Sequence, residues 1–230
     1  MKLSKWIKPS FIALSVLTIS ACGEGGNDGH NHDDGAIDIP EHISAYSGQD
    51  WSKTITATET QDGVVTGDFL IGNPDAPVLI EEYASLTCGH CANFHINMLP
   101  TVKESYIKAG VARLQLKNLV RDGSDVAAAK LARCMGPDKG YVMLDTLFTN
   151  QQFWAGQNAA KLVDYAREAG MSRAAFDRCQ SNGTLQQNLM ETLKEADSRG
   201  VTGTPTFFIN GEKIDFHGLS DLMNALKMTQ

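Results

Sequence analysis

Two cysteines separated by two residues, in the stretch Cys88-Gly89-His90-Cys91, constrain this chain more than any other feature. Residues 78–83 before them form a mostly apolar run typical of a buried strand, and residues 93–108 carry apolar side chains at roughly helical spacing. A strand, a short turn, two cysteines and a helix are the context in which this motif performs redox chemistry. A plain disulfide staple or half of a metal site is the alternative, but no second Cys/His pair with ligand spacing occurs in the sequence.

The position of the motif predicts a different role for each cysteine. A thiol at a helix N-terminus faces unpaired backbone N–H groups and the positive end of the helix dipole, so its thiolate is favoured. We therefore predict that Cys88 is the nucleophile and that Cys91, one turn inside the helix, is the less exposed resolving thiol. His90 can add positive charge or a hydrogen bond to the thiolate, which makes the disulfide more oxidising.

Residues 1–21 have the features of a secretory signal peptide. Three lysines precede an apolar run from 11 to 19, and small residues follow it. The tetrapeptide Ile-Ser-Ala-Cys that ends at Cys22 resembles a bacterial lipobox, which implies cleavage before Cys22 and lipid attachment to it. An ordinary signal peptide with an incidental cysteine is the alternative. The apolar run is too short to span a bilayer as a mature helix.

Residues 22–45 are predicted to be the lipidated cysteine and a flexible tether. Residues 23–40 are rich in glycine and aspartate and contain few apolar side chains, so they cannot bury enough surface to offset the entropy of ordering. His30 and His32 could hold a metal ion weakly, but a solvated linker is the simpler interpretation, and we predict no metal site.

The rest of the chain predicts an α/β fold interrupted by helices. Residues 46–121 contain strand-like runs, and a helix follows the two cysteines, which Pro100 should kink or split. Residues 122–199 contain no strand-like run and are predicted to form an all-helical insertion, in which Leu185, Leu189 and Leu193 share a helical face. The strand-like runs lie at 51–60, 64–66, 78–83 and 111–120.

Residues 200–230 are predicted to complete the sheet. A strand at 206–210 turns at Asn210-Gly211, returns through residues 213–214 and leads into a closing amphipathic helix.

This arrangement resembles the DsbA-type thiol:disulfide oxidoreductases of the thioredoxin superfamily, over about residues 50–230. The resemblance is carried by the two cysteines after a strand, the helical insertion and the run Gly203-Thr204-Pro205-Thr206-Phe207 before the returning strand. It implies a thioredoxin fold with an inserted all-helical subdomain. It also implies that Pro205 is cis and faces the reactive disulfide, so that Thr204 and Pro205 help to bind an extended substrate backbone.

The family resemblance also assigns a role to Glu82, six residues before the first cysteine. The family often keeps a buried acidic residue there, which assists proton transfer from the resolving cysteine. A carboxylate at a strand edge with no such role is the alternative. The pair Gly-His between the cysteines departs from the Pro-His of the best-known oxidant of the family and matches protein disulfide isomerase domains.

Cysteine usage and charge agree with an exported protein. The chain has five cysteines. With Cys22 lipidated and Cys88 paired with Cys91, only Cys134 and Cys179 remain, and we predict a structural disulfide between them. Removing residues 1–21 removes three lysines and no acid, so the formal net charge changes from −7 to −10. An acidic mature chain argues against a nucleic-acid partner.

The sequence therefore predicts a lipid-anchored oxidoreductase of the periplasm or cell envelope that needs no cofactor. Its partners would be exported proteins with cysteines and a membrane redox partner. A disulfide isomerase or reductase is one alternative, and a peptide-binding chaperone or metal carrier on the same fold is another.

Overall fold

The computed structural model describes residues 50–229, apart from the side chains of residues 157 and 158. The predicted signal peptide, Cys22 and the tether lie outside these residues. The described part contains a six-stranded sheet in the order β1-β4-β6-β5-β7-β8 and a separate two-stranded hairpin of β2 and β3. The strands are β1 (Ile55–Ala57), β2 (Thr60–Gln61), β3 (Val64–Val65), β4 (Phe69–Ile71), β5 (Val78–Ala84), β6 (Ala112–Asn118), β7 (Thr206–Ile209) and β8 (Glu212–Lys213).

The parallel pair β5 and β6 forms the centre of the sheet, and the flanking strands pair antiparallel to it. Six of the seven residues of β5 are buried, because helices cover both faces of the sheet at this point. Successive side chains of β5 point to opposite faces. Ile80 and Phe207 therefore belong to the larger apolar core, whereas Tyr83 and Phe208 belong to a smaller one with Ala196.

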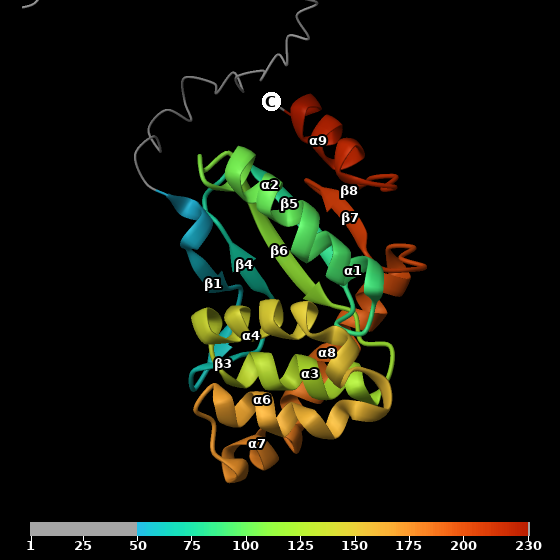
Figure 1. The fold of residues 1–230 in the computed structure, drawn as a ribbon. Helices are drawn as coiled ribbons and strands as arrows, with labels where there is room; N and C mark the ends of the chain where they lie inside the picture. The colour runs from blue at the N-terminus through green and yellow to red at the C-terminus, as the bar shows by residue number, and fades with distance from the viewer. Residues whose placement is uncertain (1–49, 230) are drawn as a thin grey trace, which may run out of the picture. The chain divides into compact units, whose positions relative to one another are not determined.

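The larger core lies beneath the helical segments that follow the two cysteines. Figure 1 shows α1 (Gly89–Asn93) and α2 (Leu99–Val102) crossing over β5 and β6. Two π-helical turns, Phe94–Met98 and Lys103–Ile107, follow α1 and α2 respectively, so the regular α-helical hydrogen bonding is interrupted on both sides of Pro100 while the chain stays helical. The closing helix α9 (Leu219–Met228) contributes Leu222 to the same core.

The predicted all-helical insertion is confirmed between β6 and β7. The apolar face predicted for residues 185–193 is only partly buried. Leu185 and Leu189 are fully buried, whereas Leu193 is 40% exposed. Thr192 and Ala196 are the buried residues of the next turn. The segments of the insertion are α3 (Gly123–Cys134), α4 (Pro137–Thr149), α5 (Gln151–Trp154), a 3-10 helix (Gly156–Lys161), α6 (Leu162–Glu168), α7 (Arg173–Gln180) and α8 (Gly183–Ser198).

The N-terminal part of the sheet differs from the prediction. The continuous strand expected at 51–60 is divided into a 3-10 turn, Trp51–Lys53, and the short strands β1 and β2. Strand β4 was not predicted, because three residues are too few to show an alternating pattern, yet it joins β1 to β6. The Asn210-Gly211 turn is confirmed: both residues have positive φ, as a two-residue hairpin turn requires.

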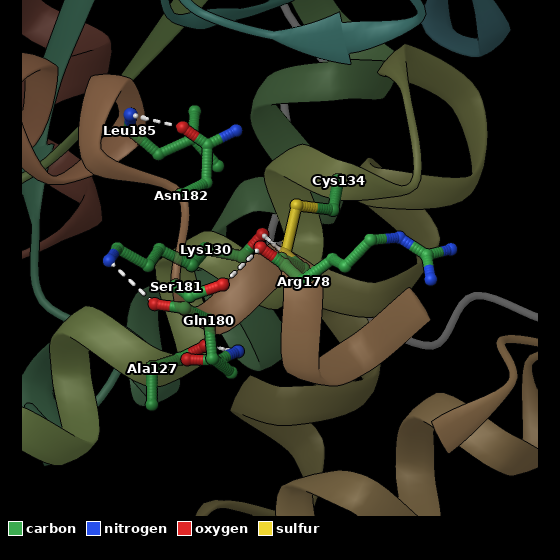
Figure 2. Close-up of a disulfide and its surroundings, with 9 residues drawn as sticks. Ala127, Lys130, Cys134, Arg178, Gln180, Ser181, Asn182 and Leu185 are labelled. Atoms are coloured by element: carbon green, nitrogen blue, oxygen red, sulfur yellow. Dashed lines mark hydrogen bonds between the residues drawn. A yellow bond between two sulfur atoms is a disulfide. The ribbon is translucent and has the colours of Figure 1, made fainter. Parts of the chain in front are cut away.

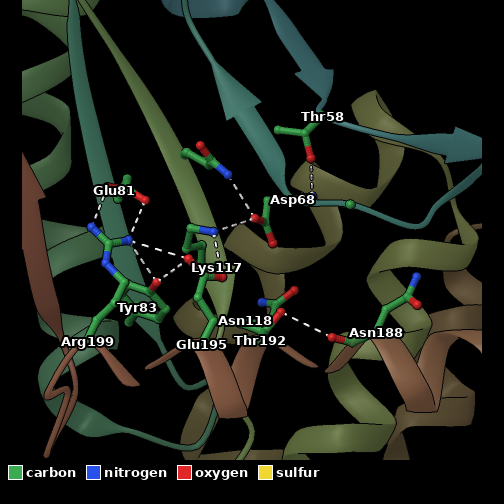
Figure 3. Close-up of polar contacts among 12 residues, drawn as sticks. Thr58, Asp68, Glu81, Tyr83, Lys117, Asn118, Asn188, Thr192, Glu195 and Arg199 are labelled. Carbon is green, nitrogen blue, oxygen red and sulfur yellow. Dashed lines mark hydrogen bonds and ion pairs between the residues drawn. The ribbon is translucent and has the colours of Figure 1, made fainter. Parts of the chain in front are cut away.

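Charged side chains join α8 to the sheet face opposite α1. Figure 3 shows Arg199 paired with Glu81 through two hydrogen bonds of 2.7 and 2.9 Å. Lys117 on β6 lies 3.1 Å from both Asp68 and Glu195. Its side chain is only 8% exposed, so these carboxylates provide the compensation that a buried ammonium group needs.

Among the helices in residues 50–229, we find none whose length and apolar character suit it to crossing a membrane.

Candidate active site

The first cysteine of the motif caps the helix that follows β5. Cys88 has extended backbone angles, and α1 begins at the next residue. Cys88 is 5% exposed, while Gly89 and His90 beside it are exposed. This position results from the sequence Ser85-Leu86-Thr87, which leaves the end of β5 and turns the chain into the helix, with the Cys88 N–H donating to the Ser85 carbonyl over 3.1 Å. The sulfur of Cys88 therefore lies at the helix N-terminus, near the surface.

The environment of Cys88 favours its thiolate. The pKa of Cys88 is lowered to about 4, first by a hydrogen bond from the Cys91 thiol, then by a hydrogen bond with the Thr204 side chain and by the backbone N–H groups of Cys91 and His90, against the opposing effect of burial. The thiol is therefore ionised at neutral pH, and a thiolate is both the nucleophile and the good leaving group in disulfide exchange.

Cys91 has the opposite environment. Its side chain is fully buried, and its pKa lies well above the ordinary value because of burial first, then the hydrogen bond it gives to Cys88 and the negative charge of Glu82. At neutral pH the pair therefore consists of a Cys88 thiolate and a protonated Cys91 thiol. The two sulfurs are free thiols in this structure.

His90 lies between the two cysteines. Its backbone N–H helps to lower the pKa of Cys88. Within the described part of the chain, the exposed imidazole makes no hydrogen bond or ion pair.

The Thr204-Pro205 loop faces the first cysteine. The peptide bond between these two residues is cis. The Cys88 thiol, when protonated, donates to the Thr204 carbonyl oxygen, with 3.2 Å between sulfur and oxygen. Thr204 and Pro205 are partly exposed, so their backbone borders the surface beside the reactive sulfur.

Comparison with known proteins agrees with this geometry. A family model described as thioredoxin matches residues 65–228, well over half of the chain. The chain belongs to this thioredoxin family. A curated relative from Rickettsia typhi, named as a protein-disulfide oxidoreductase, is 27% identical over 201 residues, which cover 86% of this chain and 73% of the relative.

Solved structures place this thioredoxin-family chain among DsbA-like proteins. α-DsbA1 from Wolbachia pipientis is 28% identical, with a TM-score of 0.65, and the match covers 70% of this chain and 90% of that protein. A protein-disulfide isomerase from Novosphingobium aromaticivorans is 26% identical, with a TM-score of 0.62 over 68% of this chain and 94% of that one. BdbD from Bacillus subtilis, 18% identical with a TM-score of 0.63, shares the fold over 70% of this chain and 91% of that one. The chain is thus a DsbA-type protein-disulfide oxidoreductase.

Glu82 of this thioredoxin-family enzyme lies on β5 beneath the cysteines and is fully buried. Its Oε2 atom lies 3.0 Å from Nε2 of His95, whose side chain is also buried. The sequence interpretation missed His95. The available signal was its spacing, because His95 follows Cys91 by four residues, about one helical turn.

Two residues of the helical insertion form hydrogen bonds with the loop before Cys88, and the sequence analysis did not predict either of them. Asp125 on α3 is 1% exposed and accepts from the Leu86 N–H at 2.7 Å and the Ser85 hydroxyl at 2.6 Å. Gln151 on α5 donates through Nε2 to the carbonyls of Leu86 and Cys88 at 2.8 and 3.0 Å. The insertion thereby fixes the backbone that positions the reactive sulfur.

Cys134 on α3 and Cys179 on α7 form a disulfide, with 2.02 Å between the sulfurs and 6.1 Å between the Cα atoms (Figure 2). Nearby, the Lys130 ammonium donates to the Gln180 carbonyl at 2.9 Å, and the Gln180 side chain donates to the Ala127 carbonyl at 3.0 Å. The bridge therefore ties together two helices that polar contacts already align. No group of three or more His, Cys, Asp or Glu residues within 50–229 is arranged to hold a metal ion.

Proposed function

We propose that this enzyme donates its disulfide to exported proteins through Cys88. A substrate thiolate attacks Cys88 in the oxidised enzyme, a mixed disulfide forms and Cys91 leaves with the electron pair. A second substrate thiolate then attacks the substrate sulfur of the mixed disulfide, so that the substrate gains the disulfide and both enzyme cysteines are reduced.

The observation that carries this proposal is the contrast between the two thiols. The pKa of Cys88 is lowered to about 4, whereas the pKa of Cys91 is raised by burial, its bond to Cys88 and the Glu82 charge. A stabilised Cys88 thiolate lowers the free energy of the reduced enzyme relative to the oxidised one, because a disulfide carries no thiolate. This favours transfer of the disulfide from enzyme to substrate.

Thr204 and Pro205 are proposed to bind the substrate next to the reactive sulfur. Both residues are partly exposed, and the Thr204 carbonyl lies within hydrogen-bonding reach of Cys88. An extended substrate segment can pair with such backbone groups as an added strand. Glu82 is proposed to exchange a proton with Cys91, since it is buried and its charge acts on that thiol.

The cellular context of this reaction is proposed from the N-terminal sequence. We infer export by residues 1–21, cleavage before Cys22 and a lipid anchor on Cys22 that holds the enzyme at a membrane of the cell envelope. A membrane redox partner would then reoxidise the Cys88–Cys91 pair. The substitution Cys22→Ser is expected to release the protein from membranes, and undiminished membrane attachment would contradict the anchor.

Trapping of mixed disulfides tests the chemistry. Cys91→Ala is expected to accumulate adducts with several exported, cysteine-containing proteins through Cys88, visible on non-reducing gels and lost on reduction. The matched control Cys88→Ala is expected to form none. Adducts of equal yield through Cys91 in that control would reverse the assignment of the two sulfurs.

Isomerisation of disulfides is a second candidate function, because one similar structure is named as a protein-disulfide isomerase. Finding the Cys88–Cys91 pair reduced in cells at steady state would favour this function over disulfide donation.

A further inference from the structure

Glu82 and His95 form a buried pair beneath the two cysteines. The exposed fractions of their side chains are 0% and 1%, and 3.0 Å separates Oε2 of Glu82 from Nε2 of His95. The imidazole stacks on the Phe148 ring, with 4.1 Å between the ring centroids and 19° between the ring planes. The hydrogen bond and the stacking together fix the orientation of the imidazole, with one nitrogen on Glu82 and the other directed away from it.

A surface cavity lies on the other side of this histidine. The cavity has a volume of about 270 Å³, and His95 is part of its lining, whereas Glu82 is not. Exposed Ile96 and Pro100 also line it, so it reaches the protein surface. His95 is therefore the residue that belongs both to the buried pair and to the lining of the cavity.

Polar side chains make this cavity suitable for water. Tyr141, Asp145 and Lys103 line it, and the Lys103 ammonium lies 4.6 Å from the centroid of the Tyr141 ring. Burial raises the pKa of Asp145, which the charges of Lys103 and His95 and a contact with Tyr141 oppose. A polar cavity of this size can hold several ordered water molecules.

Two buried polar atoms of the pair have no hydrogen-bond partner among the described residues. They are Oε1 of Glu82 and Nδ1 of His95. Buried polar groups nearly always have a partner, which is often water, and exceptions are frequent at catalytic sites. A water molecule that moves from the cavity to the buried Nδ1 of His95 can form a hydrogen bond with it. An imidazole can accept a proton at one nitrogen while it releases a proton from the other.

We propose that His95 transfers protons between Glu82 and this cavity, which makes the cavity the solvent end of the proton path that serves Cys91. This inference rests on the proposed function. When a substrate thiolate attacks Cys88, the electron pair of the broken S–S bond goes to Cys91. Glu82 receives a proton from Nε2 of His95 and passes it to the buried Cys91 thiolate, which leaves Glu82 ionised. Nδ1 of His95 takes a proton from water in the cavity.

The reverse path serves closure of the enzyme disulfide. Cys91 loses its proton through Glu82 and His95 and attacks Cys88 in a mixed disulfide, and the bound thiol leaves. Fully buried Cys91 has no exposed surface of its own. Closure therefore depends on an internal route for the proton, whereas the attack by the Cys88 thiolate does not.

Closure of the Cys88–Cys91 disulfide can be measured separately from the attack of Cys88 on a substrate disulfide. The reduced full-length enzyme is mixed with excess oxidised glutathione and quenched with acid, and mass spectrometry follows the glutathione adduct on Cys88 and the closed disulfide. His95→Asn, which retains a polar group but cannot titrate near neutral pH, is expected to slow closure at least tenfold. The matched control His217→Asn, at a histidine whose side chain is 77% exposed, is expected to close at the wild-type rate.

Two further readouts distinguish proton transfer from a merely structural role. His95→Ala should leave space beside the cavity, so added imidazole is expected to restore closure in that variant and to have no effect on wild type. The rate at which iodoacetamide alkylates Cys88 should stay within twofold of wild type in both variants. Closure within twofold of wild type in His95→Asn, or slow closure of His95→Ala that imidazole does not restore, would overturn the proposal.

Failure of the relay is distinguishable from failure of the proposed function. A wild-type enzyme that forms no glutathione adduct on Cys88 would contradict the function itself, whereas normal adducts with unaffected closure in the His95 variants would contradict only the relay. Should the His95 variants not fold, Ile96→Trp provides the decision. Ile96 is 44% exposed in the cavity lining, so a bulky side chain there is expected to slow closure severalfold, and unchanged closure would overturn the proposal.

Discussion

Removing the disulfide between Cys134 and Cys179 should lower stability by a predictable amount. The two cysteines are 45 residues apart in sequence. On the chain-entropy account, closing a loop of that length removes conformational freedom from the unfolded chain and stabilises the fold by about 4 kcal/mol. For a domain of this size, about 1 kcal/mol corresponds to about 2–4 °C in melting temperature, so the loss should be about 8–16 °C.

The assay compares single and double variants. Cys134→Ala, Cys179→Ala and the double variant are prepared with Cys22, Cys88 and Cys91 replaced by alanine, so that no other thiol can exchange with the bridge. Thermal unfolding followed by circular dichroism gives the melting temperatures. Each single substitution already opens the bridge, so the second is expected to add little.

Additive losses would refute this reasoning. If each substitution lowered the melting temperature independently, the cause would be local packing of the side chains rather than the cross-link. A double variant that melts within about 4 °C of its parent would likewise contradict the entropic magnitude. The active site should be unaffected: in a parent that retains Cys88 and Cys91, the double variant should keep the wild-type alkylation rate of Cys88.

Three further outcomes are expected. The rate at which iodoacetamide alkylates reduced Cys88 should rise with pH and reach half its maximum near pH 4, because the pKa of Cys88 is about 4. Cys91→Ala should move this midpoint to higher pH, because it removes the hydrogen bond that lowers the Cys88 pKa most. An unchanged midpoint would contradict that cause. Because a depressed thiol pKa stabilises the fold above the unfolded pKa, the reduced enzyme should lose this contribution as pH falls toward about 4, whereas the oxidised enzyme has no such thiolate to lose. Lys117→Met should lower the free energy of unfolding, measured in urea, by about 3 kcal/mol, since it leaves the carboxylates of Asp68 and Glu195 without their shared cation. A decrease below about 1 kcal/mol would show that Arg133, which lies 3.5 Å from Asp68, compensates for the missing charge.

Much of the fold could be predicted from local patterns. The apolar run 78–83, the two cysteines after it and the strand after Pro205 carry the resemblance that implies a thioredoxin fold, and the long segment without strand-like runs predicts the helical insertion. These signals depend on periodicity and turn residues, which are local properties of the chain. Strand β4 escaped prediction because its three residues carry no periodic signal, although pairing with β6 holds it in the sheet.

The surroundings of the reactive sulfur depended on contacts between distant segments. Asp125 lies 39 residues from Leu86 in sequence, and Gln151 lies 63 residues from Cys88. Neither residue stands in a pattern that marks it as functional. Their roles arise because the helical insertion packs against the end of β5.

The sequence by itself determined which two cysteines form the candidate redox pair, because their spacing and the helix that follows place Cys88 at a helix N-terminus and Cys91 one turn inside it. Only the tertiary structure decided how strongly the pKa values of the two thiols differ and which groups surround Cys91. Burial removes water from Cys91, and the fold brings Glu82 from β5 against His95 and places His95 in the wall of a cavity formed with α4. Electrostatic interactions among buried groups depend on such distances and on the exclusion of water, which no local pattern in the chain encodes.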